Sequence, residues 1–273
     1  ISERRADKIN IQSLADLAER IFSEREDVRI LPEESITMQS LLTVGSSAGG
    51  RQPKAIIAIN KETGEIRSGQ IAGLEGFEYY LLKFGNSKYS SAELEMTYYE
   101  LAKSAGINMM PSELLAVEGS NHFLTKRFDR DGDQKIHTQT LAAVYPDADS
   151  YEQLIWVCRK LLLPESDCQE VFRRMVFNIL SNNTDDHNKN FSFIMHEDGH
   201  WELAPAYDIT FTADIWKRSD DDIHSLGIYT KRCYFTEQDL ISFGEDFEIP
   251  EPRKILDEVK NAVSKFSRVA YEN

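Results

Sequence analysis

Hydrophobic residues recur with two kinds of spacing along the first part of the chain. A helical stripe at residues 14–22 is followed by short apolar runs at 55–59 and 77–84. Short apolar or β-branched runs that are bounded by turn residues are typical of strands. The pattern therefore predicts an amphipathic helix that leads into a sheet.

A second helix and a further strand pair are predicted before residue 129. A helical stripe at residues 94–105 stops at Gly106, and glycine is the favoured residue just past a helix end. The runs SELLAV and HFLTKRF flank the turn EGSN, which predicts a hairpin. The strands before and after the helix are expected to complete one sheet.

The second half of the chain has mainly helical periodicity. Apolar stripes at residues 154–162, 171–180 and 255–266 recur at intervals of three and four residues, as on the buried face of a helix. One short hairpin, FSFIM and HWELA around the turn EDG, is predicted between them. Arg173 and Arg174, within the second stripe, are expected on a solvated helix face.

These patterns predict an α+β fold with two lobes. The expected parts are a leading helical segment at residues 1–40, a β-rich N-terminal lobe at 41–128 and a mainly helical C-terminal lobe at 129–273. A chain of 273 residues is long enough to bury a core in each lobe.

Charge and cysteine content narrow the classes of function. The 31 Lys and Arg against 46 Asp and Glu give a formal net charge of −15, which argues against binding nucleic acid through the whole surface. The three cysteines lack CxxC spacing, so neither a disulfide framework nor a zinc site is indicated, and a cytoplasmic location is expected. No apolar run approaches the roughly 20 residues that span a bilayer, so no membrane association is expected.

Candidate chemistry lies in the polar loop NNTDDHNKN, between a long apolar helix and the strand FSFIM. Asp185 and Asn190 are five positions apart, as in the D-x-x-x-x-N kinase catalytic loop, where the Asp accepts the hydroxyl proton and the Asn holds a metal ion. Asp208 follows the next hairpin and is suited to be a second oxygen ligand for Mg²⁺. Taken alone, such a loop is more often a solvated turn, because Asn and Asp dominate turns.

Lys83 and the Gly/Ser-rich segment VGSSAGGRQPK are candidates for binding nucleotide phosphates. Lys83 ends an apolar run, and Glu95 lies early on the helix that follows, which suits an ion pair that holds the lysine against phosphates. Glu93 and Glu100 are competing partners. The Gly/Ser-rich segment matches neither GxGxxG nor GxxxxGK[ST], and taken alone it is a flexible hairpin connection.

These residues resemble the HipA-like serine/threonine kinases of bacterial type II toxin–antitoxin systems. The similar blocks occur in family order over about residues 41–210: SSAGGRQPKA, LLKF, ELEMTYYELAKSAGI, FLTKRFDR, NNTDDHNKNFSFI and LAPAYDI. The resemblance implies a protein-kinase-like fold with Asp185 as the catalytic aspartate and Asn190 and Asp208 as metal ligands. It also implies that Lys83 binds phosphate, while His187 either shapes the nucleotide site or is an ordinary loop histidine.

The resemblance also implies cofactors and partners. Such a kinase uses ATP and Mg²⁺, phosphorylates a host protein, commonly an aminoacyl-tRNA synthetase, and reaches DNA only through a small helix-turn-helix antitoxin. Its phosphate-binding loop would here be Ser47, Ala48, Gly49 and Gly50, with Ser46 or Ser47 autophosphorylated. The usual N-terminal β-rich subdomain of the family is not matched, so either a separate small protein supplies it or the chain is truncated.

Two other functions fit part of the pattern. A small-molecule kinase, such as an antibiotic phosphotransferase, would use the same Asp, Asn and Asp set, although blocks such as FLTKRFDR and LAPAYD argue against it. An inactive pseudokinase that acts as a scaffold in a repressor complex is disfavoured by the intact set Lys83, Asp185, Asn190 and Asp208. The main expectation is an active serine/threonine protein kinase.

Overall fold

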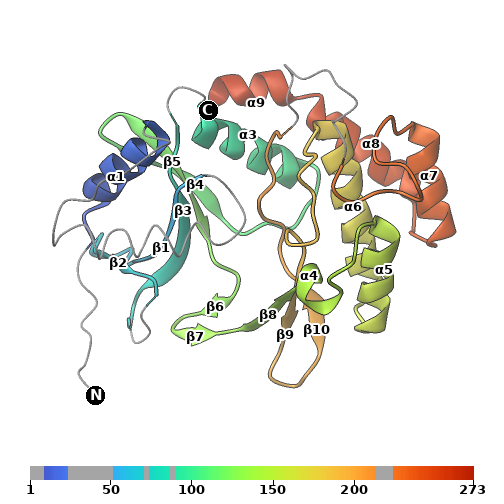
Figure 1. The fold of residues 1–273 in the computed structure, drawn as a ribbon, viewed down its shortest axis with the longest axis horizontal. Helices are drawn as coiled ribbons and strands as arrows, with labels where there is room; N and C mark the ends of the chain where they lie inside the picture. Colours follow the sequence, from blue (N-terminus) through green and yellow to red (C-terminus); the bar gives the residue numbers. More distant parts are fainter. Residues whose placement is uncertain (1–8, 24–51, 71–73, 87–89, 213–223) are drawn as a thin grey trace. The chain divides into compact units, whose positions relative to one another are not determined.

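The chain forms two compact units in its computed structural model (Figure 1). The structure describes residues 9–23, 52–70, 74–86, 90–212 and 224–273. Unit 1 comprises Ile1–Met96 and Pro111–Lys135, and unit 2 comprises Thr97–Met110 and Ile136–Asn273. Antiparallel sheets and helices both occur, which confirms the predicted α+β class.

Unit 1 contains a five-stranded antiparallel sheet in the order β2-β1-β3-β5-β4. Its strands are β1 (Lys54–Ile59), β2 (Ile66–Ser68), β3 (Glu78–Lys83), β4 (Ser112–Val117) and β5 (Ser120–Lys126). The two predicted hairpins are present as β1 with β2 and β4 with β5, and β3 joins them in the middle of the sheet. The short β-branched and aromatic runs thus predicted all five strands.

Helix α1 (Ile11–Ser23) packs on this sheet and shares its hydrophobic core. The helix contributes Leu14, Leu17 and Ala18, which are almost completely buried. They form one cluster with sheet residues, among them Ala55, Ile57, Leu82 and Leu124. Full burial of one leucine side chain stabilises a fold by roughly 1.5–3 kcal/mol, so α1 is an integral part of unit 1.

The segment DRDGDQK forms a tight hairpin of β6 (Arg130–Asp131) and β7 (Gln134–Lys135). At its turn, the Asp133 carboxylate accepts hydrogen bonds from the Leu74 N–H (2.9 Å) and the Tyr79 hydroxyl (2.8 Å). These bonds fasten the hairpin to the loop before β3 and to β3 itself, so Asp133 has a structural role here.

Unit 2 is mainly helical, with a small sheet in the order β10-β9-β8. The strands are β8 (His137–Thr140), β9 (Ser192–Met195) and β10 (Trp201–Leu203). The helices are α4 (Leu141–Val144), α5 (Tyr151–Lys160), α6 (Glu165–Ser181), α7 (Glu237–Asp246), α8 (Pro252–Val263) and α9 (Phe266–Glu272), together with the later part of α3 (Ser91–Ser104). In the part of the chain that the structure describes, no helix is long and apolar enough to cross a membrane.

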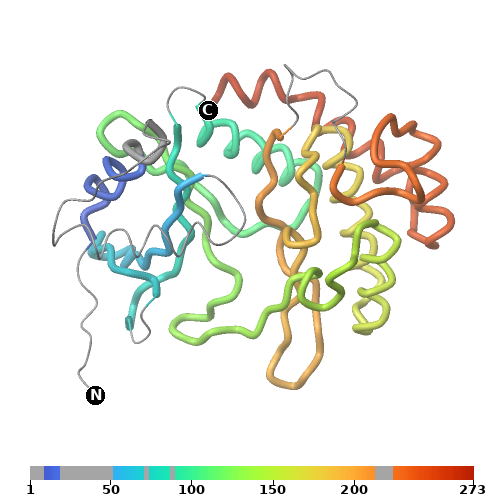
Figure 2. Tube along the Cα trace, in the orientation of Figure 1, coloured from blue at the N-terminus to red at the C-terminus, as the bar shows by residue number. Residues whose placement is uncertain are grey.

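Helix α6 runs through unit 2 and packs against α5 and α8 (Figure 2). Its apolar residues Val171, Phe172, Met175 and Val176 are fully buried. The Phe172 ring stacks with Phe243 of α7 at a centroid distance of 6.3 Å. Because α6 is anchored by these buried side chains, its C-terminal end gives the loop that follows a rigid starting point.

Arg173 and Arg174 do not form the solvated helix face that the sequence predicted. Arg174 is buried, and its guanidinium donates to Glu170 Oε1 (2.8 Å) and to the Ala204 carbonyl (3.0 Å). Arg173 donates to the Ala105 carbonyl and to Glu258 Oε2, both at 2.7 Å. That prediction was wrong because α6 packs on several sides, and polar groups taken out of water must find partners within the fold.

We expect Arg174→Ala to lower the free energy of unfolding by roughly 2–4 kcal/mol, because it leaves Glu170 and the Ala204 carbonyl without their buried donor. Arg268→Ala is the matched control, since Arg268 pairs with Glu272 on an exposed face and such pairs contribute roughly 0–1 kcal/mol. Urea denaturation of both variants provides the comparison. Equal and small losses would contradict the structural role of Arg174.

Candidate active site

Lys83 and Glu95 form a buried ion pair in unit 1. Lys83 is the last residue of β3, Glu95 lies in the first half of α3, and the Lys83 Nζ donates to Glu95 Oε1. The two residues are only 5% and 4% exposed. Of the competing carboxylates, Glu93 accepts a hydrogen bond from the Asn121 amide (2.9 Å). Glu95 is therefore the carboxylate that holds the Lys83 side chain at the end of its strand.

The Gly/Ser-rich residues Ser46, Ser47, Ala48, Gly49 and Gly50 lie outside the described part of the structure. The described chain resumes at residue 52. There, Gln52 Nε2 donates to the Phe84 carbonyl (2.9 Å), and Phe84 N–H donates to the Pro53 carbonyl (3.0 Å). The chain that follows the Gly/Ser-rich segment is thus bonded to the residue directly after Lys83.

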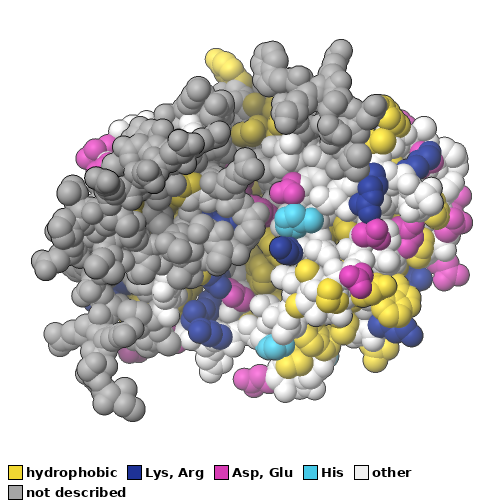
Figure 3. Space-filling view, in the orientation of Figure 1, with side chains coloured by type: hydrophobic (Ala, Val, Ile, Leu, Met, Phe, Trp, Pro, Cys, Tyr) yellow, Lys and Arg dark blue, Asp and Glu magenta, His cyan; other side chains and the backbone are white. Residues whose placement is uncertain are grey.

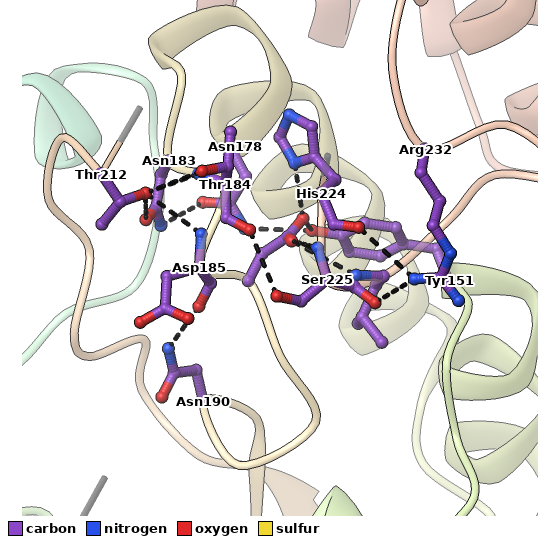
Figure 4. A network of polar contacts seen from close by, with 12 residues as sticks. Tyr151, Asn178, Asn183, Thr184, Asp185, Asn190, Thr212, His224, Ser225 and Arg232 are labelled. Carbon is purple, nitrogen blue, oxygen red and sulfur yellow. Dashed lines mark hydrogen bonds and ion pairs between the residues drawn. The ribbon is translucent and has the colours of Figure 1, made fainter. Parts of the chain in front are cut away.

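In unit 2, the loop that carries Asp185 begins where α6 ends. The helix stops at Asn182, which has φ 57°, a left-handed conformation that asparagine tolerates better than most residues. The next residue, Asn183, is buried, and its amide donates to Asn178 Oδ1 (3.0 Å) of α6. The start of the loop is therefore hydrogen-bonded to the last turn of α6 (Figure 4).

The backbone of Asp185 is held on both sides by side chains. Thr212 Oγ1 accepts hydrogen bonds from the N–H groups of Thr184 (2.7 Å) and Asp185 (3.1 Å). Asn190 Nδ2 donates to the Asp185 carbonyl (2.8 Å) (Figure 4). The Asp185 side chain is nevertheless 54% exposed. A fixed backbone therefore presents an accessible carboxylate, as a group that orients a substrate hydroxyl requires.

The surroundings of Asp185 disfavour its negative charge. Partial burial raises the pKa of this carboxyl above its usual range, and the charges of Asp208 and Asp186 raise it further. His187 acts in the opposite direction, with its Nε2 3.8 Å from Asp185 Oδ1. A cation placed beside Asp185 and Asp208 would relieve this repulsion.

Asp208 and Asn190 offer the oxygen chemistry that Mg²⁺ prefers. Asp208 follows β10 with φ 58°, and the residue before it, Tyr207, donates its hydroxyl proton to the Lys189 carbonyl (2.7 Å). Because the Asn190 nitrogen is used on Asp185, its amide oxygen faces away from that residue (Figure 4). Two protein oxygens fit Mg²⁺, which usually takes its remaining ligands from water and phosphate. Among the described residues, no group of three or more His, Cys, Asp or Glu side chains could hold a metal ion.

Asp186 is a prominent residue of this loop that the sequence analysis did not single out. It is 1% exposed, and its carboxylate accepts four hydrogen bonds, from Tyr151, His224 and the N–H groups of Ser225 and Leu226. The pair Asp185 and Asp186 is visible in the sequence. Which of the two is buried depends on partners that lie far away along the chain.

The structure brings the predicted residues together in two groups. Asp185, His187 and Asn190 lie in one loop of unit 2, and the charge of Asp208 acts on Asp185. Lys83 and Glu95 meet in unit 1. His187 has its Nδ1 buried without a hydrogen-bond partner among the described residues.

Curated relatives are described as kinases. The chain is 30% identical over 201 residues to a "Putative kinase" of Haemophilus influenzae, which covers 64% of this chain and 55% of the relative. It is 24% identical over 210 residues to "Putative kinase Y4dM" of Sinorhizobium fredii, covering 70% of this chain and 51% of the relative. The chain thus spans about half the length of the curated relatives it matches.

A solved structure shares the fold. HipA of Shewanella oneidensis MR-1, determined in complex with HipB and its operator DNA, matches with a TM-score of 0.70 and 18% identity over 100% of this chain and 66% of that one. This likeness confirms the fold class predicted for this chain, a protein-kinase-like fold shared with HipA. The profile of the HipA-like C-terminal domain matches residues 46–266, most of the sequence. The chain therefore belongs to the HipA-like C-terminal domain family.

Proposed function

We propose that this chain is an ATP-dependent serine/threonine protein kinase of the HipA-like toxin type. The observation that carries the proposal is the exposed Asp185 carboxylate on a backbone whose N–H and carbonyl are both hydrogen-bonded, with Asn190 as one of the partners. Phosphoryl transfer requires positioning and charge neutralisation more than covalent help from the protein. The curated relatives, which are described as kinases, support the same reaction class.

Each site residue has a role in this reaction. Asp185 orients the acceptor hydroxyl and accepts its proton while the oxygen bonds to the γ-phosphorus and the bond to ADP breaks. Lys83, held by Glu95, binds phosphate oxygens of the nucleotide. Asn190 and Asp208 hold Mg²⁺, which neutralises charge on the phosphates when it is bound. His187 and the segment Ser47 to Gly50 complete the nucleotide site in this proposal.

The protein partners are also proposals. We assign a host protein as the substrate, with an aminoacyl-tRNA synthetase as the first candidate, and a HipB-like helix-turn-helix antitoxin as the binding partner. The complex of the Shewanella HipA with HipB and DNA supports the second assignment. The net charge is −15, and Figure 3 shows acidic side chains lying between basic ones. Because DNA is itself negatively charged, this surface favours contact with DNA only through a basic partner. A cytoplasmic location is consistent with this function.

We expect Asp185→Asn to lower phosphoryl transfer at least about 100-fold, because the amide can orient a hydroxyl but cannot take its proton. Thermal stability and ATP binding should be nearly unchanged, since the side chain is exposed. Transfer of label from radiolabelled ATP to the protein itself or to a bacterial lysate measures the reaction. Asp198→Asn, at an exposed hairpin, is the control that should retain activity. Undiminished labelling in Asp185→Asn would refute the assigned role.

Asp208→Ala and Asn190→Ala should each weaken ATP binding only when Mg²⁺ is present, because each removes an oxygen ligand of the ion. Lys83→Ala should weaken binding with or without Mg²⁺, since it removes a direct phosphate contact. Calorimetry with Mg²⁺ and with a chelator separates the two effects, and Lys61→Ala, an exposed lysine of unit 1, is the control. Thermal unfolding of Lys83→Ala is measured in parallel, because the change leaves Glu95 buried without this partner. Wild-type affinity in all three variants would exclude the proposed site.

Autophosphorylation at Ser46 or Ser47 should switch the kinase off. A phosphoserine adds roughly −1.5 to −2 charges beside an anionic nucleotide, which should expel the segment or the ATP. We expect Ser46→Asp or Ser47→Asp to lower ATP affinity and transfer, while the matching Ala variants stay active. Mass spectrometry before and after incubation with ATP identifies the modified serine. If both Asp variants bind ATP and phosphorylate substrate normally, the switch does not exist.

A further inference from the structure

We infer that Asp186 is the positioning residue of the site, which holds Asp185 in place by fastening the loop to the segment of residues 224–226. This inference rests on the proposed kinase function. Asp186 Oδ1 accepts from the N–H groups of Ser225 (2.8 Å) and Leu226 (3.3 Å). Its Oδ2 accepts from the Tyr151 hydroxyl (2.7 Å) and from His224 Nδ1 (2.9 Å).

The two neighbouring aspartates point in opposite directions. The Asp186 side chain is 0% exposed and the Asp185 side chain is 54% exposed. Rotation of this part of the loop would bring Asp186 out of its four hydrogen bonds and turn Asp185 inward. The burial of one carboxylate therefore fixes the direction in which the other is presented, and orientation is what a group that positions a hydroxyl must have.

A carboxylate suits this position because its partners can all act as donors. Two are backbone N–H groups, and the Tyr151 hydroxyl accepts from Asn178 Nδ2 (3.0 Å), so its own proton is directed to Asp186. Burial and the charge of Asp186 raise the pKa of Tyr151 well above its usual range, which keeps this donor protonated. An ionised carboxylate can accept from several donors at once, whereas an amide side chain has only one acceptor oxygen.

The elements that Asp186 joins belong to the core of unit 2. Tyr151 is the first residue of α5 and is fully buried, while Asn178 lies in α6. Ser225 N–H is also 3.1 Å from the Thr184 carbonyl, so this one donor bonds the segment to two residues of the loop, Thr184 and Asp186. Arg232 donates to the Ser225 carbonyl (Figure 4). It also donates, at 2.8 Å, to Asp149 Oδ2. The loop is thereby connected to two helices and to a segment distant in sequence.

The test compares Asp186→Asn with a destabilised control that leaves the site intact. Phe172→Leu removes packing between α6 and α7 without touching the loop network. With the fraction of folded protein matched, we expect Asp186→Asn to lower kcat at least about tenfold while KM for ATP changes little. Phe172→Leu should keep the wild-type kcat. A kcat of Asp186→Asn equal to that of Phe172→Leu would overturn the inference.

A double-variant cycle separates positioning from general stability. If Asp186 acts through Asp185, then Asp186→Asn should cost no further activity in the Asp185→Asn background, although thermal stability should still fall. The same fold loss of activity in both backgrounds would mean that Asp186 acts independently of Asp185. That outcome would also overturn the inference.

Hydrogen exchange tests the anchoring without reference to catalysis. In Asp186→Asn, the peptides that cover residues 183–190 and 224–228 should exchange faster, and those of α8 should not change. Unaltered exchange would refute the anchor even in an active kinase. If the wild-type protein transfers no phosphate to any acceptor, the proposed function fails, and the exchange result alone then decides whether Asp186 anchors the loop.

Discussion

The burial of carboxylates against hydrogen-bond donors is the constraint on which the candidate site depends. Glu95 in unit 1 is buried with Lys83, and Asp186 in unit 2 is buried with four donors. A buried charge is tolerated only when its partners remain in place, and the loss of one partner is strongly destabilising. Each buried carboxylate therefore holds a neighbouring functional group in a defined position: the Lys83 ammonium in one case and the Asp185 backbone in the other.

The Asp185 carboxylate has the opposite property, since its side chain is 54% exposed. Partial burial raises its pKa, the charges of Asp208 and Asp186 raise it further, and His187 lowers it. A cation beside Asp185 and Asp208 in unit 2 would relieve this repulsion. An exposed carboxylate on a hydrogen-bonded backbone distinguishes this loop from a solvated turn.

Much of the architecture could be predicted from the sequence because burial leaves a periodic signal. The strands of unit 1 and helices α5, α6 and α8 have such a signal. Helix α7 was not predicted, although Thr236 and Asp239 form a capping box at its start. Strand β8, HTQT, is polar and is defined by its pairing with β9. For this strand a tertiary neighbour, and not local preference, determines the structure.

The same limit applies to the site. The spacing of Asp185 and Asn190 was sufficient to locate the loop. The buried role of Asp186 could not be predicted, because its donors lie 35 to 40 residues away along the chain. Arg174 was placed on the wrong surface for a related reason, since its acceptor Ala204 is 30 residues away. Sequence periodicity carries no information about such partners.

Phosphoryl transfer to a hydroxyl is the central claim, and mass spectrometry of the reaction tests it most directly. The purified protein is incubated with Mg²⁺ and ATP that carries a heavy oxygen isotope in its γ-phosphate, alone and with a bacterial lysate. The account predicts labelled phosphoserine or phosphothreonine on the protein or on a lysate protein, and none when Mg²⁺ is chelated or Asp185 is replaced by Asn. Bound ATP without labelled phosphate on any protein would contradict it.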